Sequence, residues 1–463
     1  MSDEMPAAAS QADRPQAQLR RFVHPVQEFI DTESAGGIVL GAAALLAIVW
    51  ANSPWSDSYH DLLGSLLVVD LAFFRVDQPL HFWVNDVAMV VFFFLVGMEI
   101  KRELVVGELR SLRRVVVPLS AALGGMLVPI GFFLLVVRGT EASTGWGVPM
   151  ATDIAFALGV VALLGRRIST QLKVLLLAVA IFDDLGAVMV IAVFYTDVVE
   201  VVPLLIGVTL LGMVPVLSRL GVRKMTVYVL VGVAAWAAVL ESGVHPTVVG
   251  VAMGLLTPWR SWYSSADFPG KADRMLERLS EAVDAPSDSH AHEQRTEALL
   301  ELSEISRETV APLDRLEREL HPWVAFAIVP VFAWANAGVS LGGGVIGDAL
   351  SSSLTWAIAA GLILGKPIGL FVGYAIAVRL GGERSASITW RGVIGIGMLA
   401  GIGFTIALFV AELAFDDEAL LTQAKVGILT ASLVSGMAGY LVLLGMHSPP
   451  EGDGEAPSEA LSD

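Results

Sequence analysis

LKVLLLAVAIFDDLGAVMVIAVFY, residues 172–195, is an apolar run that carries two adjacent carboxylates, Asp183 and Asp184, at its centre. A helix that crosses a bilayer needs about 20 residues, so the run predicts one transmembrane helix. An ionisable side chain at the middle of such a helix costs about 2.5–3.5 kcal/mol on insertion. Apolar packing does not explain two such residues side by side, and the pair therefore predicts a functional site inside the membrane.

Further apolar runs surround this one, and we predict an all-α polytopic membrane protein with twelve transmembrane helices. The chain has 463 residues, of which 55% are hydrophobic and 16% are charged. Its mean hydropathy is +0.69. A soluble enzyme or a disordered protein is excluded, because such chains are less apolar and more charged. The predicted helices lie near residues 36–52, 84–100, 115–137, 146–165, 172–195, 201–217, 225–241, 243–258, 323–341, 354–379, 391–412 and 424–446.

The formal net charge of −17 comes mostly from two polar stretches rather than from the apolar runs. Residues 261–320 hold fourteen acidic and seven basic side chains, and residues 448–463 hold five acidic side chains and no basic one. This acidic balance argues against nucleic-acid binding, which needs a basic surface. The predicted organisation is an N-terminal arm (1–35), helices 1–8 (36–260), an acidic loop insert (261–320), helices 9–12 (321–447) and an acidic tail (448–463).

The basic residues predict the orientation, because the cytoplasmic loops of membrane proteins are enriched in Lys and Arg. Seventeen bases lie in the arm and in connections on its side of the membrane. The opposite side holds only Arg75, Arg138 and Lys425. We therefore predict that both termini, the insert and the tail are cytoplasmic. The first 21 residues are polar and are not expected to be a signal peptide.

Two more ionisable residues, Asp153 and Lys366, fall inside predicted membrane helices. Pro149 precedes Asp153, and the run GIGMLAGIGFTIALF (395–409) is rich in glycine. Interrupted helices mark the binding sites of many transporters, and their free ends carry partial charges. Asp153 and Lys366 are therefore candidates for neutralising the ends of broken helices. A buried ion pair that only holds helices together is the structural alternative.

The chemistry of the aspartate pair indicates ion exchange. Carboxylate oxygens suit small hard cations, and two carboxylates in a low-dielectric site hold a proton until a cation replaces it. We predict that Asp183 and Asp184 bind Na⁺ or Li⁺ and protons in turn. A site that holds either ion, but not both, defines an exchanger. No other cofactor is expected.

At these residues the chain resembles the NhaA family of bacterial sodium/proton antiporters. The similarity is carried, in order, by HFWVNDVAMVVFFFLVGMEIKREL, VPMATDIAFALGV, AIFDDLGAV, SGVHPTVVGV, HPWVAFAIVPVFAWANAGVS, GLILGKPIG and AGIGFTIALF. It implies an electrogenic antiporter of the bacterial cytoplasmic (inner) membrane, which exports Na⁺ or Li⁺ in exchange for external protons. The resemblance therefore implies a secondary transporter and not an enzyme.

The resemblance also implies details of the fold. The fourth and eleventh helices are expected to be broken and to cross, with Asp153, Lys366 and Thr152 at the crossing. Helices three to five and ten to twelve are expected to form inverted repeats. A homodimer is expected, supported by a small periplasmic β-hairpin in the first loop, where residues 66–76 contain strand-forming side chains.

Activation by rising cytoplasmic pH is a further property that the resemblance implies. The matching residues are Glu99, Arg102, Glu103, Glu317, His321, His245 and Asp86. One position that can be histidine in the family is Arg318 here, which does not titrate near neutral pH. The insert is also longer than expected for a compact member; its leucines between Leu299 and Leu320 predict an amphipathic helix interrupted near Pro312.

Two other functions compete with the antiporter. The first is a sodium-coupled organic-anion symporter of similar broken-helix fold, for which Lys366 would be the only basic residue in the cavity. The second is an intramembrane enzyme, either an aspartyl protease or a Mg²⁺-dependent prenyl transferase. The transferase needs several spaced acids to hold a diphosphate through Mg²⁺, and one adjacent pair does not supply them.

Overall fold

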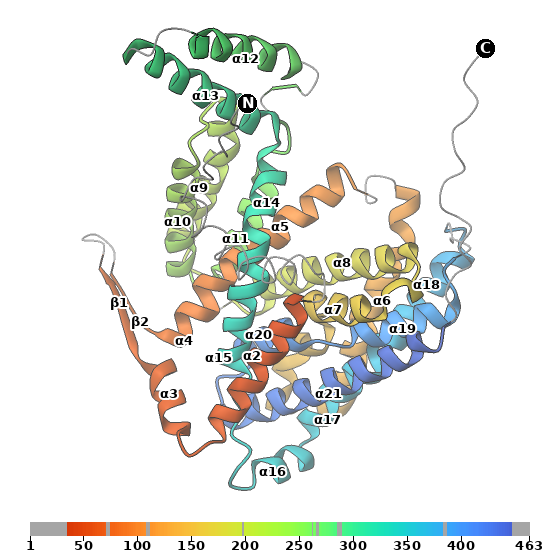
Figure 1. Ribbon diagram of the computed structural model, residues 1–463. Helices are drawn as coiled ribbons and strands as arrows, with labels where there is room; N and C mark the ends of the chain where they lie inside the picture. The colour runs from red at the N-terminus through yellow and green to blue at the C-terminus, as the bar shows by residue number, and fades with distance from the viewer. Residues whose placement is uncertain are drawn as a thin grey trace, which may run out of the picture.

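The computed structural model describes residues 35–70, 75–107, 112–196, 199–261, 263–264, 268–284, 289–382 and 387–446. The N-terminal arm up to residue 34 and the acidic tail therefore lie outside the described residues. The cytoplasmic location of both termini stays a prediction. Within them the protein is a bundle of helices with one small sheet (Figure 1).

The helical segments mostly follow the apolar runs of the sequence. Before the insert they are α2 (Ala35–Ala51), α3 (Ser56–Gly64), α4 (Leu80–Phe82), the π-helical turn η2 (Trp83–Ala88), α5 (Met89–Val105), α6 (Leu112–Val137), the 3₁₀ segment η4 (Glu141–Met150), α7 (Ile154–Leu164), α8 (Thr170–Phe194), α9 (Val201–Arg219), α10 (Met225–Glu241) and α11 (Thr247–Leu256). After it they are η6 (Val324–Ile328), α15 (Val329–Asn336), α16 (Val345–Ser351), α17 (Ser353–Ala360), η7 (Gly361–Gly365), α18 (Lys366–Arg379), α19 (Trp390–Ala400), α20 (Phe404–Ala414) and α21 (Glu418–Leu444).

Among the described residues, seven helices are long and apolar enough to cross a membrane, or nine if each bent pair counts as one span. The polytopic membrane class is thus confirmed, whereas the count of twelve stays a prediction. The difference arises from segments such as α10 and α11, which have 17 and 10 residues and fall short of the roughly 20 that a straight span needs. Exposed leucines and valines on the outer faces of these helices match a lipid-facing surface.

Close packing in the middle of the bundle depends on small residues. α6 lies against α18, and a side chain at Gly124 would collide with the carbonyl oxygen of Gly369. Membrane helices approach this closely only where glycine or another small residue stands at the contact. This contact brings the α6 backbone beside the helix that begins with Lys366.

The β-hairpin predicted in the first loop is present. β1 (Leu66–Asp70) pairs antiparallel with β2 (Arg75–Pro79), in a register that places Leu66 opposite Pro79 and Asp70 opposite Arg75. The ribbon extends away from the helical bundle (Figure 1). Its location on the periplasmic side and its part in a dimer stay predictions.

Two helical segments of the described residues are interrupted, and that these are the broken fourth and eleventh membrane helices stays a prediction. Residues 151–153 are extended between η4 and α7, and residues 401–403 separate α19 from α20, whose axes differ by 45°. The two interruptions touch, since the Asp153 amide donates to the carbonyl oxygen of Ile402 at 2.6 Å. Backbone without helical hydrogen bonds is tolerated at this depth because it is buried in protein.

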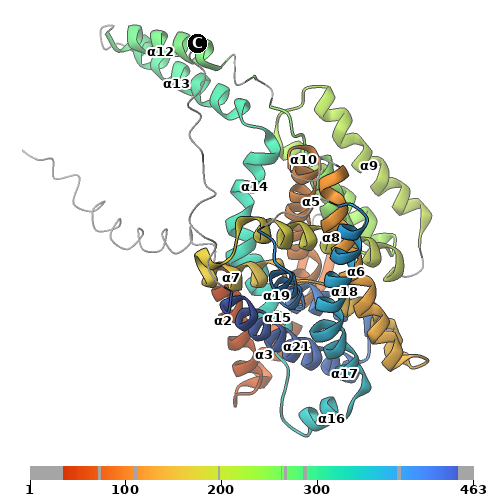
Figure 2. The same ribbon diagram turned by 90° about the vertical axis from the view of Figure 1, so that its right-hand side faces the viewer.

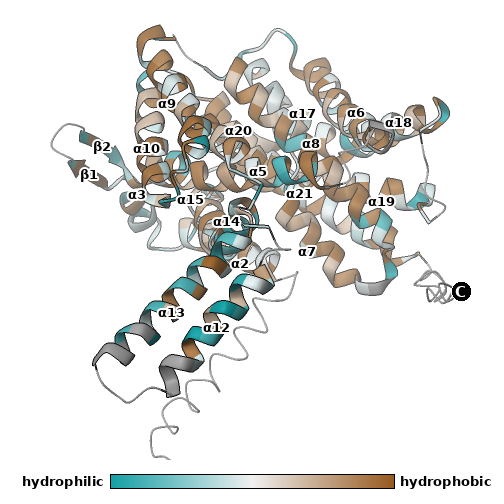
Figure 3. Cartoon of the chain, turned by 90° about the horizontal axis from the view of Figure 1, so that it is seen from above, coloured by the Kyte–Doolittle hydropathy of each residue, from teal (hydrophilic) through white to brown (hydrophobic). Residues whose placement is uncertain are grey.

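The insert forms three helices, α12 (Phe268–Asp284), α13 (Ser289–Thr309) and α14 (Pro312–Trp323). α12 and α13 make a hydrophilic hairpin that projects from the bundle, while α14 leads back into it (Figures 2 and 3). The break at residues 310–311 confirms the interruption predicted near Pro312. The predicted apolar face is only partly buried, because Leu313 is 1% exposed but Leu299 on the projecting hairpin is 53% exposed.

Candidate functional site

The aspartate pair lies in the middle of α8 and is shielded from solvent. Asp183 is 0% exposed and Asp184 is 2% exposed. The helix starts at a Ser169 cap, whose hydroxyl accepts from the Leu172 amide, and continues without a break to Phe194. An uninterrupted apolar helix therefore holds both carboxylates in the interior of the bundle.

Lys366 is the cationic partner of this pair. Its Nζ donates to Asp183 Oδ2 at 2.5 Å, and both side chains are 0% exposed. Lys366 begins α18 directly after the π-helical turn η7, and such turns frequently occur at functional sites. Its contact is therefore with the aspartate pair, whereas a role in neutralising helix ends stays a prediction.

Thr152 connects the aspartate pair to the interrupted segments. Its Oγ1 lies 2.7 Å from Asp183 Oδ2 and 2.9 Å from the carbonyl oxygen of Ala400, the last residue of α19. A hydroxyl has one hydrogen to donate, so these two acceptors compete for it. A change at Asp183 is thereby linked to the end of a helix.

Asp153 lies where two helices begin. Its Oδ1 accepts from the Phe156 amide at 2.9 Å and caps α7. Its Oδ2 accepts from the Thr405 amide at 3.1 Å and from the Thr405 hydroxyl at 2.7 Å, at the start of α20. The N-terminal ends of helices carry partial positive charge, so one carboxylate serves both ends. Sequence reasoning did not single out Thr405; its signal was a threonine directly after the glycine-rich break.

One oxygen of each α8 carboxylate has no hydrogen-bond partner among the described residues. These atoms are Asp183 Oδ1 and Asp184 Oδ1, and both are buried. Buried polar atoms are nearly always paired, so two unpaired oxygens on adjacent residues require an explanation. Oxygen atoms of this kind are the ligands that hard cations prefer, and a proton on either carboxylate would also occupy them.

A cavity of about 870 Å³ is lined by residues of α14 and by the start of α7, the helix that Asp153 caps. Arg102, Glu317 and His321 line it, together with Arg318. Arg102 Nη1 pairs with Glu317 Oε1 at 2.5 Å, with side chains 53% and 15% exposed. Glu99 is on the same helix as Arg102 and Glu103.

The residues predicted to regulate the protein lie in two places. Asp86 Oδ1 faces His245 Nε2 at 3.4 Å, and His245 Nδ1 lies 2.7 Å from Thr247 Oγ1. Asp86 precedes Glu99 by thirteen positions on one continuous helix, which is roughly 20 Å along its axis. The Asp86–His245 pair is therefore at the other end of that helix from the charged cavity.

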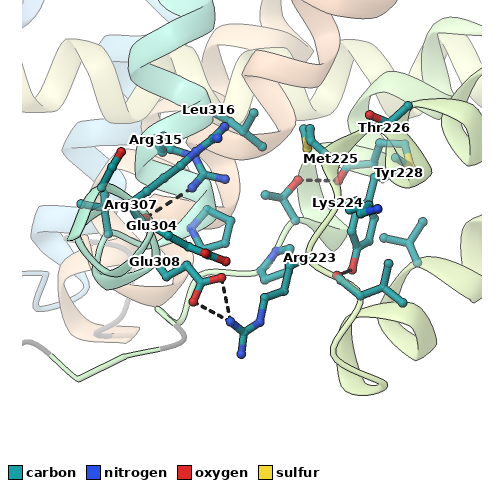
Figure 4. Close-up of a pocket in the computed structure, with 18 of the residues that line it drawn as sticks. Arg223, Lys224, Met225, Thr226, Tyr228, Glu304, Arg307, Glu308, Arg315 and Leu316 are labelled. Carbon is teal, nitrogen blue, oxygen red and sulfur yellow. Dashed lines mark hydrogen bonds and ion pairs between the residues drawn. The ribbon is translucent and has the colours of Figure 1, made fainter. Parts of the chain in front are cut away.

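A second cavity, of about 630 Å³, holds none of the predicted site residues. It lies between the α9–α10 connection and the helices of the insert (Figure 4). Across it, Arg223 Nη1 pairs with the two carboxylate oxygens of Glu308 at 2.7 and 2.6 Å (Figure 4). This contact joins the end of α13 to the bundle.

Ionisable side chains buried in an apolar helical bundle define a class, the polytopic membrane proteins that carry ions or solutes. A family model described as Na+/H+ antiporter 1 matches residues 27–443. The chain belongs to this family, and the predicted family membership is confirmed.

Several curated relatives are similar over nearly their whole length. Na(+)/H(+) antiporter NhaA 2 of Sorangium cellulosum is 45% identical over 431 residues, which cover 92% of this chain and 91% of the relative. Na(+)/H(+) antiporter NhaA 2 of Syntrophotalea carbinolica is 43% identical, with 90% and 96% covered. Na(+)/H(+) antiporter NhaA of Koribacter versatilis is 43% identical, with 97% and 98% covered.

Proposed function

We propose that the chain exchanges Na⁺ for protons across the bacterial inner membrane, and that Asp183 and Asp184 bind both ions in turn. The observation that carries this proposal is the pair of unpartnered carboxylate oxygens, Asp183 Oδ1 and Asp184 Oδ1, buried beside Lys366. A Na⁺ ion needs oxygen ligands, and adjacent carboxylates provide them at a site that is shielded from solvent.

Competition between Lys366 and the cation explains how the two ions exclude each other. In the described geometry the ammonium group neutralises Asp183. A cation that binds between the two carboxylates takes over that role and releases protons, and its departure lets protons and the ammonium return. More protons than cations move per cycle if Asp184 and one further group titrate together. Each net charge moved across 100 mV is then worth about 2.3 kcal/mol.

Thr152 and Asp153 keep the ends of the surrounding helices in place during this exchange. The proposed fold has twelve spans, inverted repeats, and broken fourth and eleventh helices that cross where Asp153 meets Ile402 and Thr405. We propose that residues 36–260 and 321–447 form this transport unit. The insert, both termini and the charged cavity are then cytoplasmic, and the β-hairpin is periplasmic and contributes to a homodimer.

Asp184→Asn tests the assignment directly. It keeps the size of the side chain and removes its proton and most of its attraction for a cation, so we expect Na⁺-driven proton release from everted vesicles to disappear. Asp416→Asn, at an exposed position, is the matched control and should exchange like the wild type. Wild-type exchange by Asp184→Asn would rule out the proposed site.

Regulation by pH and transport of Li⁺ belong to the same proposal. Arg102, Glu317 and His321 line the charged cavity, and Glu99 and Glu103 are on the same helix as Arg102. Asp86, which faces His245, is near the opposite end of that helix. Proton flux measured between about pH 6 and pH 9, where histidine and buried carboxylates titrate, with Na⁺, Li⁺ and K⁺ in turn, would test both points. A rate independent of pH would remove the regulatory role.

The organic-anion symporter receives no support from the site. Lys366 is the basic residue that such a substrate would need, and it is already neutralised by Asp183 at 2.5 Å. Uptake of an organic solute that depends on Na⁺ would be needed to reopen this alternative.

A further inference from the structure

A second lysine–carboxylate pair lies far from the α8 site, at the opposite end of α20 from Thr405. Glu412 is on the last turn of α20, and Lys425 is on α21. Lys425 Nζ lies 2.6 Å from Glu412 Oε1, and the side chains are 15% and 13% exposed. Both side chains are therefore mostly buried, and the Glu412 Oε1 atom is shielded from solvent.

This pair repeats the chemistry of Lys366 and Asp183 at a shallower depth. In both cases one ammonium group neutralises one carboxylate across 2.5–2.6 Å. Partial burial makes an unpaired charge costly, so a carboxylate that loses its lysine favours a proton or a cation in its place.

One face of α20 extends from Thr405, which binds Asp153, to Glu412, which binds Lys425. Thr405, Phe409 and Glu412 follow at steps of four and three residues, and such positions share a helix face. Seven residues span roughly 10 Å. Thr405 binds Asp153 at the inner end, so an ion that travels along this face would meet Glu412 at one end and the proposed site at the other.

An apolar layer of side chains lies between Glu412 and Thr405. Phe409 is 1% exposed, and its ring packs on those of Phe93 and Phe332 with centroids 5.5 and 6.1 Å apart. The ring of His245 lies 5.4 Å from the same side chain. The described conformation is therefore closed to ions between Glu412 and Asp153.

Buried polar groups flank the Glu412 side of this layer. His81 Nε2 lies 3.8 Å from Glu412 Oε1 and 3.1 Å from Asn336 Oδ1. Asn336 Nδ2 in turn donates to Asn85 Oδ1 at 2.8 Å. Asn336 is 0% exposed and Asn85 is 8% exposed, so polar side chains continue inward from Glu412 across three helices.

We propose that Glu412, held by Lys425, is an outer exchange site where the transported ion or proton leaves or enters the external solution. This inference rests on the proposed antiport and adds a binding site to its ion pathway on the periplasmic side. The charged and titratable groups that face Glu412 are Lys425 from α21, His81 from α4 and Tyr59 from α3, on which the carboxylate acts electrostatically.

Glu412→Gln in proteoliposomes of uniform orientation tests the proposal. The pH is varied only on the face that carries Glu412, and the initial rate of Na⁺ flux is measured. Because the variant removes the carboxylate that would bind the ion or proton at the proposed site, we expect the rate to fall about tenfold and to lose its dependence on pH at that face. The response to pH at the other face should be unchanged, and Glu412→Asp should retain the wild-type behaviour.

Two further variants separate the role of the Glu412 carboxylate from the effect of leaving Lys425 unpaired. Glu418→Gln, at an exposed position on the first turn of α21, is the matched control and should behave as wild type. The double variant Glu412→Gln/Lys425→Met removes the ammonium left unpaired by the single change, and it should stay slow because the carboxylate itself is missing.

Three outcomes would overturn the proposal: wild-type rates in Glu412→Gln, equal loss of the pH response at both faces, or full recovery in the double variant. A thermal unfolding midpoint for each variant separates loss of fold from loss of exchange. Failure of the antiport proposal would appear elsewhere, as exchange retained by Asp184→Asn.

Discussion

Two ion pairs of the same length show how differently one interaction can serve a protein. Lys366 and Asp183 lie 2.5 Å apart with both side chains 0% exposed. Arg102 and Glu317 also lie 2.5 Å apart, but their side chains are 53% and 15% exposed. A buried charge that loses its partner cannot be solvated by water, whereas an exposed one can. Burial rather than distance therefore determines what each pair contributes.

The largest effect is expected from Lys366→Met, which leaves Asp183 buried without a cation. Removing one partner of a buried pair costs about 3–5 kcal/mol, so the thermal unfolding midpoint of the purified protein should fall markedly. Exchange should be lost as well, because the ammonium no longer competes with Na⁺ for Asp183.

The double variant Lys366→Met/Asp183→Asn sharpens this result. It replaces the pair by neutral side chains, and we expect most of the lost stability to return while exchange stays absent. Equal stability of Lys366→Met and the wild type would show that the pair is not isolated from water, and the contrast between the two regions would fail.

An intermediate effect is expected from Thr405→Val, which keeps the shape of the side chain and removes one hydrogen bond to Asp153. A hydrogen bond to a charged group contributes about 1.5–3 kcal/mol, and the Thr405 amide still serves Asp153 Oδ2. Chemical unfolding in detergent would measure the loss. Thr430→Val, at an exposed position on α21, provides a comparison, and an equal loss there would contradict a specific role for Thr405.

The smallest effect on stability is expected from Glu317→Gln. A half-exposed pair contributes about 0.2–1 kcal/mol and is weakened by salt, so the unfolding midpoint should change little and the change should shrink at high ionic strength. Its effect should instead appear in the pH profile of exchange, because Glu317 faces Arg102 at the cavity. A loss of stability as large as that of Lys366→Met would contradict the comparison.

Local sequence was sufficient where the signal is a cost that each residue carries by itself. Asp183, Asp184, Asp153 and Lys366 stand out because lipid-buried charges are expensive, and all four are buried in the structure. The break before Pro312 was also predicted from local residues, whereas the β-hairpin was expected from the family resemblance. Thr405 was missed because a threonine in an apolar helix carries no such cost.

Partners and grouping were harder to predict because they depend on contacts between distant segments. Lys366 was expected at the ends of broken helices, and its contact is with Asp183, 183 positions earlier. Among the residues expected to regulate the protein, Arg102 meets Glu317 and Asp86 meets His245, and neither pairing was predicted from the sequence. Helix periodicity gives the face of a residue but not the neighbour that this face meets.

The sequence by itself determined that this is a polytopic membrane protein of the Na⁺/H⁺ antiporter family with a few costly charges in its core. Hydrophobicity, helix length and the free-energy cost of a buried charge are properties of short segments, so the sequence alone reveals them. The tertiary structure alone decided which charge neutralises which, that Asp153 meets Thr405, and that Glu412 meets Lys425. These pairings arise only when helices pack, because the free energy of a buried charge depends on the groups that surround it.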